Sequence, residues 1–130
     1  MSYALSATVR RPFGETVEAT RAALGEQGFG VLTEIDLAAT LKEKIGADIA
    51  PQVILGACRP PLAHAAVEAE PSIGLLLPCN VVVRAVDDST TVVEAMDPDV
   101  MVSLTGNENL TDVAADARDR LSTALSTLTG

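Results

Sequence analysis

The chain has 130 residues and a formal net charge of −9, with 48% hydrophobic but only 2% aromatic residues. This length is close to that of one domain, so we expect residues 1–130 to form a single domain with an aliphatic core. The net negative charge and the scarcity of aromatic side chains argue against a nucleic-acid partner. Binding to nucleic acid needs basic side chains that neutralise phosphates and often aromatic side chains that stack on bases. The same charge is repelled by an anionic membrane surface.

No apolar run reaches the roughly 18 residues that a membrane-spanning helix needs. The N-terminal segment MSYALSATVRRPFG lacks the order of basic, apolar and small residues that marks a signal peptide. We therefore expect a cytoplasmic protein that does not associate with membranes. Its two cysteines are then expected to be reduced thiols.

The first half of the chain alternates between strand and helix patterns. Alternating apolar and polar residues predict a half-buried strand over residues 2–10. Helical spacing predicts a helix over residues 15–27, ended by Gly28 in a left-handed conformation. The segment FGVLTEI is rich in β-formers and predicts a second strand. Asp36 then caps a short helix that closes at Gly46.

The second half predicts further strands and a long helix. QVILGAC indicates an interior strand, and Pro60 and Pro61 start a short helix where a missing amide has no cost. IGLLLPCNVVVRAV predicts a strand broken into two pieces near Pro78, and TTVVEAM a further strand. An apolar stripe over residues 110–128 predicts the last helix, capped by Asn109. This order favours an α+β fold, a mainly antiparallel sheet with helices packed on one face.

Both cysteines and the single histidine fall within residues 56–80, GACRPPLAHAAVEAEPSIGLLLPCN. Cys58 ends a predicted strand just before a helix, where the helix dipole and the charge of Arg59 favour a thiolate. Cys79 follows Pro78, where an irregular strand can re-aim a side chain toward a site. A free cysteine is also among the most commonly buried residue types, so either thiol can instead fill a gap in the core.

His64 and Glu68 are four residues apart on the predicted helix. Rotation by 100° per residue puts Leu62, Ala65, Ala66 and Ala69 on the opposite side, so we expect the pair to point outward. Such a pair can bind a metal, transfer a proton or form only a surface hydrogen bond. A metal site needs about four converging ligands, and neither a CxxC pair nor a histidine pair occurs, so no metal site is predicted.

The run GACRPPLAHAAVEAEPSIGLLLPCNVVV, together with AMDPDVM and the closing helix, resembles the bacterial and archaeal family catalogued as domain of unknown function 302. The similarity extends from about Gly28 to Leu128. The resemblance implies an α+β fold akin to one half of the TATA-box-binding protein, and a homodimer. It implies no reaction, and the fold likeness implies no DNA binding. The family pattern usually has Asn after the first cysteine, where this chain has Arg59.

Taken together, these patterns predict a homodimer that binds a small ligand or partner in a pocket bordered by Cys58, His64, Glu68, Cys79 and Asn80. No cofactor is indicated, and whether the protein catalyses a reaction stays open. Two alternatives remain. One is a thiol-dependent enzyme or redox protein with Cys58 as its candidate catalytic residue. The other is a dimeric adaptor or metal-binding module whose GACRPPLAH segment is an interface.

Overall fold

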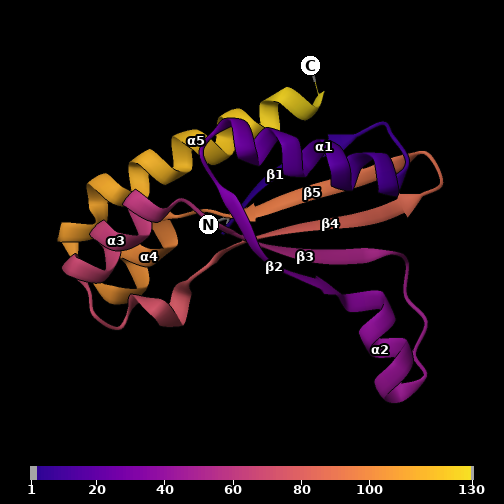
Figure 1. Cartoon of the computed structure of the whole chain (residues 1–130), viewed down its shortest axis with the longest axis horizontal. Helices are drawn as coiled ribbons and strands as arrows, with labels where there is room; N and C mark the ends of the chain where they lie inside the picture. The colour runs from indigo at the N-terminus through magenta and orange to yellow at the C-terminus, as the bar shows by residue number, and fades with distance from the viewer. Residues whose placement is uncertain (1–2, 130) are drawn as a thin grey trace.

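The computed structural model describes residues 3–129, which form one five-stranded sheet whose neighbouring strands are all antiparallel (Figure 1). The strands lie in the order β1-β5-β4-β3-β2. Their bounds are β1 Ala4–Val9, β2 Gly30–Asp36, β3 Gln52–Cys58, β4 Cys79–Asp87 and β5 Thr90–Met96. The antiparallel sheet confirms the predicted α+β class. Position 2, at the start of the first predicted strand, lies outside the described residues.

Helices connect or follow these strands. Their bounds are α1 Phe13–Glu26, α2 Leu37–Ile45, α3 Pro60–Ala69, α4 Asp99–Thr105 and α5 Thr111–Thr129, with short 3-10 turns at Ile73–Leu76 and Glu108–Leu110. Every helix predicted from the sequence is present, and α4 is an additional one. Among residues 3–129, no helix is long and apolar enough to cross a bilayer.

The predicted end of α1 and both predicted ends of α2 are confirmed by their capping residues, whereas α1 starts at Phe13, two residues before the predicted start. The Asp36 carboxylate accepts a hydrogen bond of 2.9 Å from the Ala39 amide, which satisfies one of the free N–H groups at the start of α2. Gly46 ends α2 with a φ of 68°, and Gly28 follows α1 with a φ of 83°. Both angles lie in the left-handed region, which glycine adopts without the steric cost of a Cβ.

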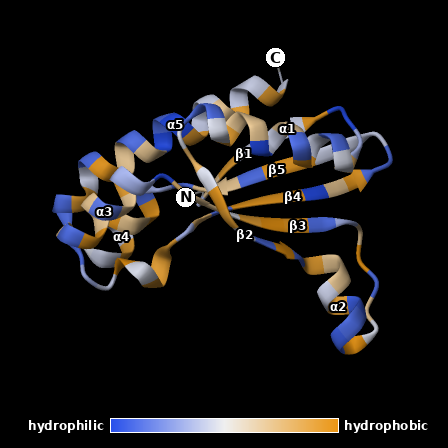
Figure 2. Ribbon diagram, in the orientation of Figure 1, coloured by the Kyte–Doolittle hydropathy of each residue, from blue (hydrophilic) through white to orange (hydrophobic). Residues whose placement is uncertain are grey.

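The main core lies between one face of the sheet and the helices α1 and α5 (Figure 1). Successive residues of a strand point to opposite faces, so every second side chain of the sheet contacts these helices. The largest fully buried members of this core are Val9, Leu24, Leu55, Val81, Val83, Val93 and Leu121. Figure 2 shows β3 and β4 mainly in hydrophobic colours, whereas α5 alternates along its length. The core is aliphatic, as the composition predicts.

A second, smaller cluster lies beyond the end of the sheet. It joins α3, α4 and the first turns of α5 through the buried residues Ala66, Ile73, Met101, Leu110 and Ala114. The helices α1 and α5 pack on one face of the sheet, in line with the predicted fold class, whereas α3 and α4 pack beyond the end of the sheet. The reason is tertiary: α5 is long enough to extend past the strands, and the shorter helices pack against its overhang.

The opposite face of the sheet is not covered by α1 or α5. It carries Ile54, Val82 and Val92, which are half-buried, and an ion pair in which Arg84 Nε lies 3.0 Å from Glu94 Oε1. The helix α2 extends away from the other helices (Figure 1) and has no buried residue. This face and α2 therefore leave apolar side chains in contact with solvent.

Two local predictions are wrong in detail. The segment before Pro78 forms a 3-10 turn rather than a strand. Ile73, the first residue of this turn, packs in the second cluster, where it is fully buried, and not in the sheet. Asn109 does not cap α5. It lies within the preceding 3-10 turn, where its own amide donates to the side chain of Asn107 at 2.9 Å.

Candidate functional site

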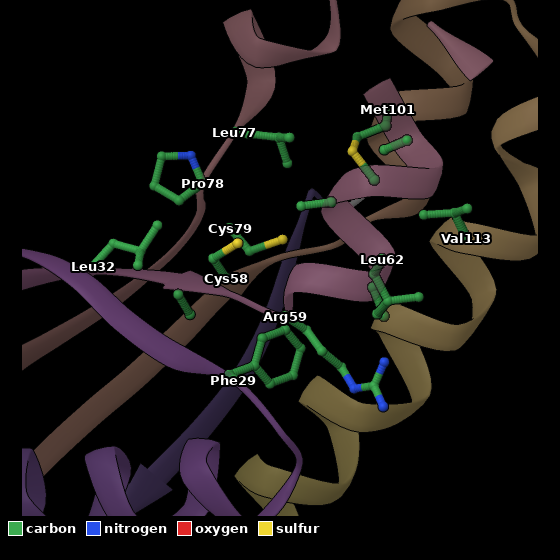
Figure 3. Close-up of a pocket in the computed structure, with 14 residues that line it drawn as sticks. Phe29, Leu32, Cys58, Arg59, Leu62, Leu77, Pro78, Cys79, Met101 and Val113 are labelled. Carbon is green, nitrogen blue, oxygen red and sulfur yellow. The ribbon is translucent and has the colours of Figure 1, made fainter. Parts of the chain in front are cut away.

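A cavity of about 270 Å³ lies between the two cores, where the ends of β3 and β4 meet α3, α4 and α5 (Figure 3). Its principal lining side chains are Phe29, Cys58, Arg59, Leu62, Cys79 and Met101. The remaining lining residues are aliphatic. The site is therefore a largely apolar pocket that contains both thiols of the chain.

The two cysteines meet because of the strand register. Cys58 is the last residue of β3 and Cys79 is the first residue of β4, and in an antiparallel pair the end of one strand lies beside the start of the next. Ala57 is paired directly with Cys79, which puts Cys58 one position further on. Figure 3 shows the two side chains next to each other at the wall of the cavity. Both cysteines are among the residues that line this cavity.

The Cys79 thiol is held in its protonated form. Its residue is 7% exposed, and burial, with a smaller contribution from the neighbouring Cys58, raises the pKa of Cys79 to about 11 from an ordinary value of 9.0. Burial has this effect because the thiolate loses its hydration while the neutral thiol loses little. At neutral pH this side chain therefore acts as a small apolar group with a weak S–H donor.

This raised pKa predicts a loss of stability in alkali. The folded state holds the Cys79 proton up to about pH 11, whereas the unfolded chain releases it near pH 9, so its stabilising effect is complete below pH 9 and is lost as the pH rises to 11. We expect the free energy of unfolding to fall by roughly 2 to 3 kcal/mol over this interval. Denaturant titrations at several pH values between 8 and 11 measure the free energy of unfolding of the wild type and of Cys79→Ala. The same decrease with pH in both proteins would contradict the prediction.

Arg59 lies between the last residue of β3 and the first residue of α3. Its Nε is fully buried and has no hydrogen-bond partner. A Cβ added at Gly28 would lie 2.9 Å from this Nε, so only glycine lets the arginine side chain pass. Figure 3 shows the guanidinium directed away from the two cysteine sulfurs. The sequence interpretation, in which the charge of Arg59 acts on Cys58, is therefore not supported by the direction of the side chain.

His64 and Glu68 form the outward pair that the helical rotation predicts. His64 Nε2 lies 3.0 Å from Glu68 Oε1, and the two side chains are 78% and 69% exposed. Neither residue lines the cavity. The only histidine of the chain is thus separated from the thiols, and a catalytic pair of Cys58 and His64, as in cysteine hydrolases, has no support from the geometry.

Asn80 also lies away from the cavity. It follows Cys79 in β4, so its side chain points to the opposite face of the sheet, where it is exposed and paired with Gly56. As for metal ions, within residues 3–129 no three His, Cys, Asp or Glu side chains are close enough to hold one.

Sequence reasoning missed several lining residues. Phe29, Leu62 and Met101 line the cavity although no local motif marks them. Met101 belongs to α4, whose ends do carry a sequence signal: Asp99 lies in its first turn, and Gly106 follows its last residue with a φ of 65°. No helix is predicted from this signal above, and the signal does not place Met101 beside the two cysteines.

An antiparallel sheet covered on one face by two helices is an α+β fold, and this fold with an apolar cavity beyond its strand ends does not by itself define an activity. The chain belongs to the family described as domain of unknown function DUF302, which it matches over residues 5–128. The match begins well before Gly28, where the resemblance in the sequence begins.

A solved structure shows the same fold. The chain is similar to an uncharacterized conserved DUF302 protein from Bacillus stearothermophilus, with a TM-score of 0.91 and 29% sequence identity. The similarity covers 98% of this chain and 99% of that one. A search of curated proteins finds no match to the chain. The comparisons therefore define the family and the fold, and function has to be argued from the site.

Proposed function

We propose that this protein binds a small, largely apolar ligand in the cavity beside Cys58 and Cys79. The observation that carries the proposal is the chemistry of the wall. Of residues 3–129, Arg59 is the only one with a charged side chain that lines the cavity, and the other lining residues are aliphatic, aromatic or sulfur-containing. Concave, mostly apolar pockets with a few polar groups are typical of small-molecule sites.

The size of the cavity limits the ligand. A water molecule occupies about 30 Å³ in the liquid, and a methylene group is of similar size, so a volume of about 270 Å³ accommodates roughly nine such groups. This corresponds to a medium-length hydrocarbon chain or one substituted ring. Burial of each methylene contributes about 0.8 kcal/mol, so a chain of this length gains enough free energy to bind without a covalent bond.

Octanol is a suitable neutral probe for this proposal. We expect it to bind the wild type in a saturable manner and to bind Ala63→Leu at least about tenfold more weakly, because Ala63 lines the cavity and a leucine there fills part of it. Isothermal titration calorimetry measures both affinities.

Ala65→Leu is the matched control, since Ala65 lies on the same helix but is exposed and does not line the cavity. This variant should bind octanol as the wild type does. Equal binding by all three proteins would place the ligand elsewhere. If octanol and its charged analogues all fail to bind the wild type, the proposal is wrong.

We also propose that two copies of the chain associate through the uncovered face of the sheet. The half-buried aliphatic residues Ile54, Val82 and Val92 form an apolar strip there, and Ile45, at the end of α2, is 74% exposed. A twofold axis through such a surface would let α2 of each copy cover the strip of the other. The family resemblance, which implies homodimers, supports the same partner.

A charge placed in the centre of this strip should prevent association. We expect Val82→Glu, on the interior strand β4, to sediment as a monomer at concentrations at which the wild type is dimeric, because a buried carboxylate without a partner is strongly disfavoured. Ser103→Glu adds the same charge on the exposed surface of α4 and should leave the dimer unchanged. A monomeric wild type, or a Val82→Glu dimer of equal affinity, would overturn the proposal.

A further inference from the structure

We propose that the ligand of this cavity is an amphiphilic monoanion, whose carboxylate pairs with Arg59 and whose hydrocarbon body fills the space beside the two thiols. This inference rests on the proposed function and adds the chemical class of the ligand. It follows from three observations on residues 3–129: Arg59 has no carboxylate partner, no neighbouring group replaces it as an anion ligand, and it lies at one end of the pocket.

Arg59 differs from the other arginines with similar exposure. Arg21, Arg84 and Arg120 are also half-buried, and each is paired with a carboxylate, from Glu34, Glu94 and Asp116 respectively. Within residues 3–129, Arg59 forms no ion pair, and its buried Nε has no acceptor. A buried donor on a charged group is costly to leave unpaired. Of these four arginines, Arg59 alone lacks a carboxylate partner among the described residues, and an anionic ligand in the cavity would supply one.

The groups next to Arg59 would neither bind an anion in its place nor repel one. The helix α3 begins with Pro60 and Pro61, which have no N–H, and the amides of Leu62 and Ala63 both donate to the Arg59 carbonyl. Unlike most helix starts, this one has no free backbone donor in its first turn. No carboxylate lines the cavity either. An anion bound here would depend on the guanidinium alone.

The position of Arg59 gives the ligand a direction. Figure 3 shows the guanidinium beside Phe29 and Leu62, on the side of the cavity opposite Leu77 and Pro78. A linear ligand with its head at Arg59 would therefore extend past Cys58 toward those two apolar residues. Allowing roughly nine groups of about 30 Å³ for the whole ligand, an eight-carbon monocarboxylate such as octanoate fits the volume of about 270 Å³.

The test compares octanoate, octanol and octylamine at neutral pH by isothermal titration calorimetry. On the wild type, we expect octanoate to bind at least about tenfold more tightly than octanol, and octylamine more weakly than either, because a hydrogen-bonded charge pair adds to the shared hydrocarbon contacts. This comparison uses the native protein and does not depend on any variant folding.

Two variants assign the effect to the guanidinium. Arg59→Met should lose the preference for octanoate and keep its affinity for octanol, while Arg59→Lys, which keeps the charge but not the Nε–H, should keep only part of it. Arg10→Met removes the same charge from an exposed position outside the cavity and should behave as the wild type. Equal binding of octanoate and octanol by the wild type would overturn the inference and leave the apolar site intact. A preference that survives in Arg59→Met would also overturn it.

Discussion

Leu121→Ala is expected to lower the free energy of unfolding by about 3 to 4 kcal/mol, the largest effect of any substitution considered for this chain. Leu121 lies in the middle of α5 and is 0% exposed, in contact with the aliphatic core between α5 and the sheet. Truncation removes buried methyl groups and leaves a cavity, because side chains locked between two packed elements relax only in part. Denaturant unfolding followed by circular dichroism measures the change.

Leu104→Ala is the matched control for this prediction. Leu104 also lies in a helix, α4, but is 67% exposed, so its removal should change the free energy of unfolding by no more than about 0.5 kcal/mol. Similar losses for both leucines would mean that α5 is not packed on the sheet as described.

Gly56→Ala is expected to destabilise the fold by about 3 kcal/mol through overpacking. Gly56 lies in β3, on the face of the sheet that α1 and α5 do not cover. A Cβ there would lie 2.2 Å from Thr33 Oγ1 and 2.8 Å from Pro78 Cγ, both closer than real side chains approach. The neighbouring strand and the segment before β4 must shift to make room. Because Pro78 also lines the cavity, the same variant should weaken octanol binding.

Gly30→Ala is the control, since a Cβ at this strand position would meet only the Cys58 carbonyl at 3.9 Å, an ordinary contact. It should leave stability almost unchanged. The double variant Thr33→Ala with Gly56→Ala should recover part of the loss, because it removes the closest of the two clashes. Equal effects of the two glycine substitutions would contradict the proximity of Thr33 and Pro78 to β3.

The local structure of this chain is predictable where one residue controls it. Asp36 and Gly46 set the two ends of α2 through a side-chain cap and a left-handed turn, and both are visible in the sequence. The place of α2 in the fold is not visible there. Its leucines have the spacing of a buried face, yet none is buried, because burial depends on which surfaces the rest of the chain brings near.

The candidate site was predictable only in part for the same reason. Cys58 and Cys79 come together because β3 and β4 are neighbours in the sheet, and the sequence patterns do not establish this pairing. His64 and Glu68 face outward, as the rotation of the helix predicts. The path of Arg59 past Gly28 depends on a contact between residues that are distant in the sequence, so no local pattern reveals it.

The helix α2 has a consequence for the dynamics of the protein. Its turns are closed by local hydrogen bonds and its side chains contribute nothing to either core, so it can unfold locally without cost to the sheet. Its amide protons would then exchange with solvent faster than those of α5. If a second copy covers α2, this exchange would slow as protein concentration rises, which makes α2 an internal reporter of self-association.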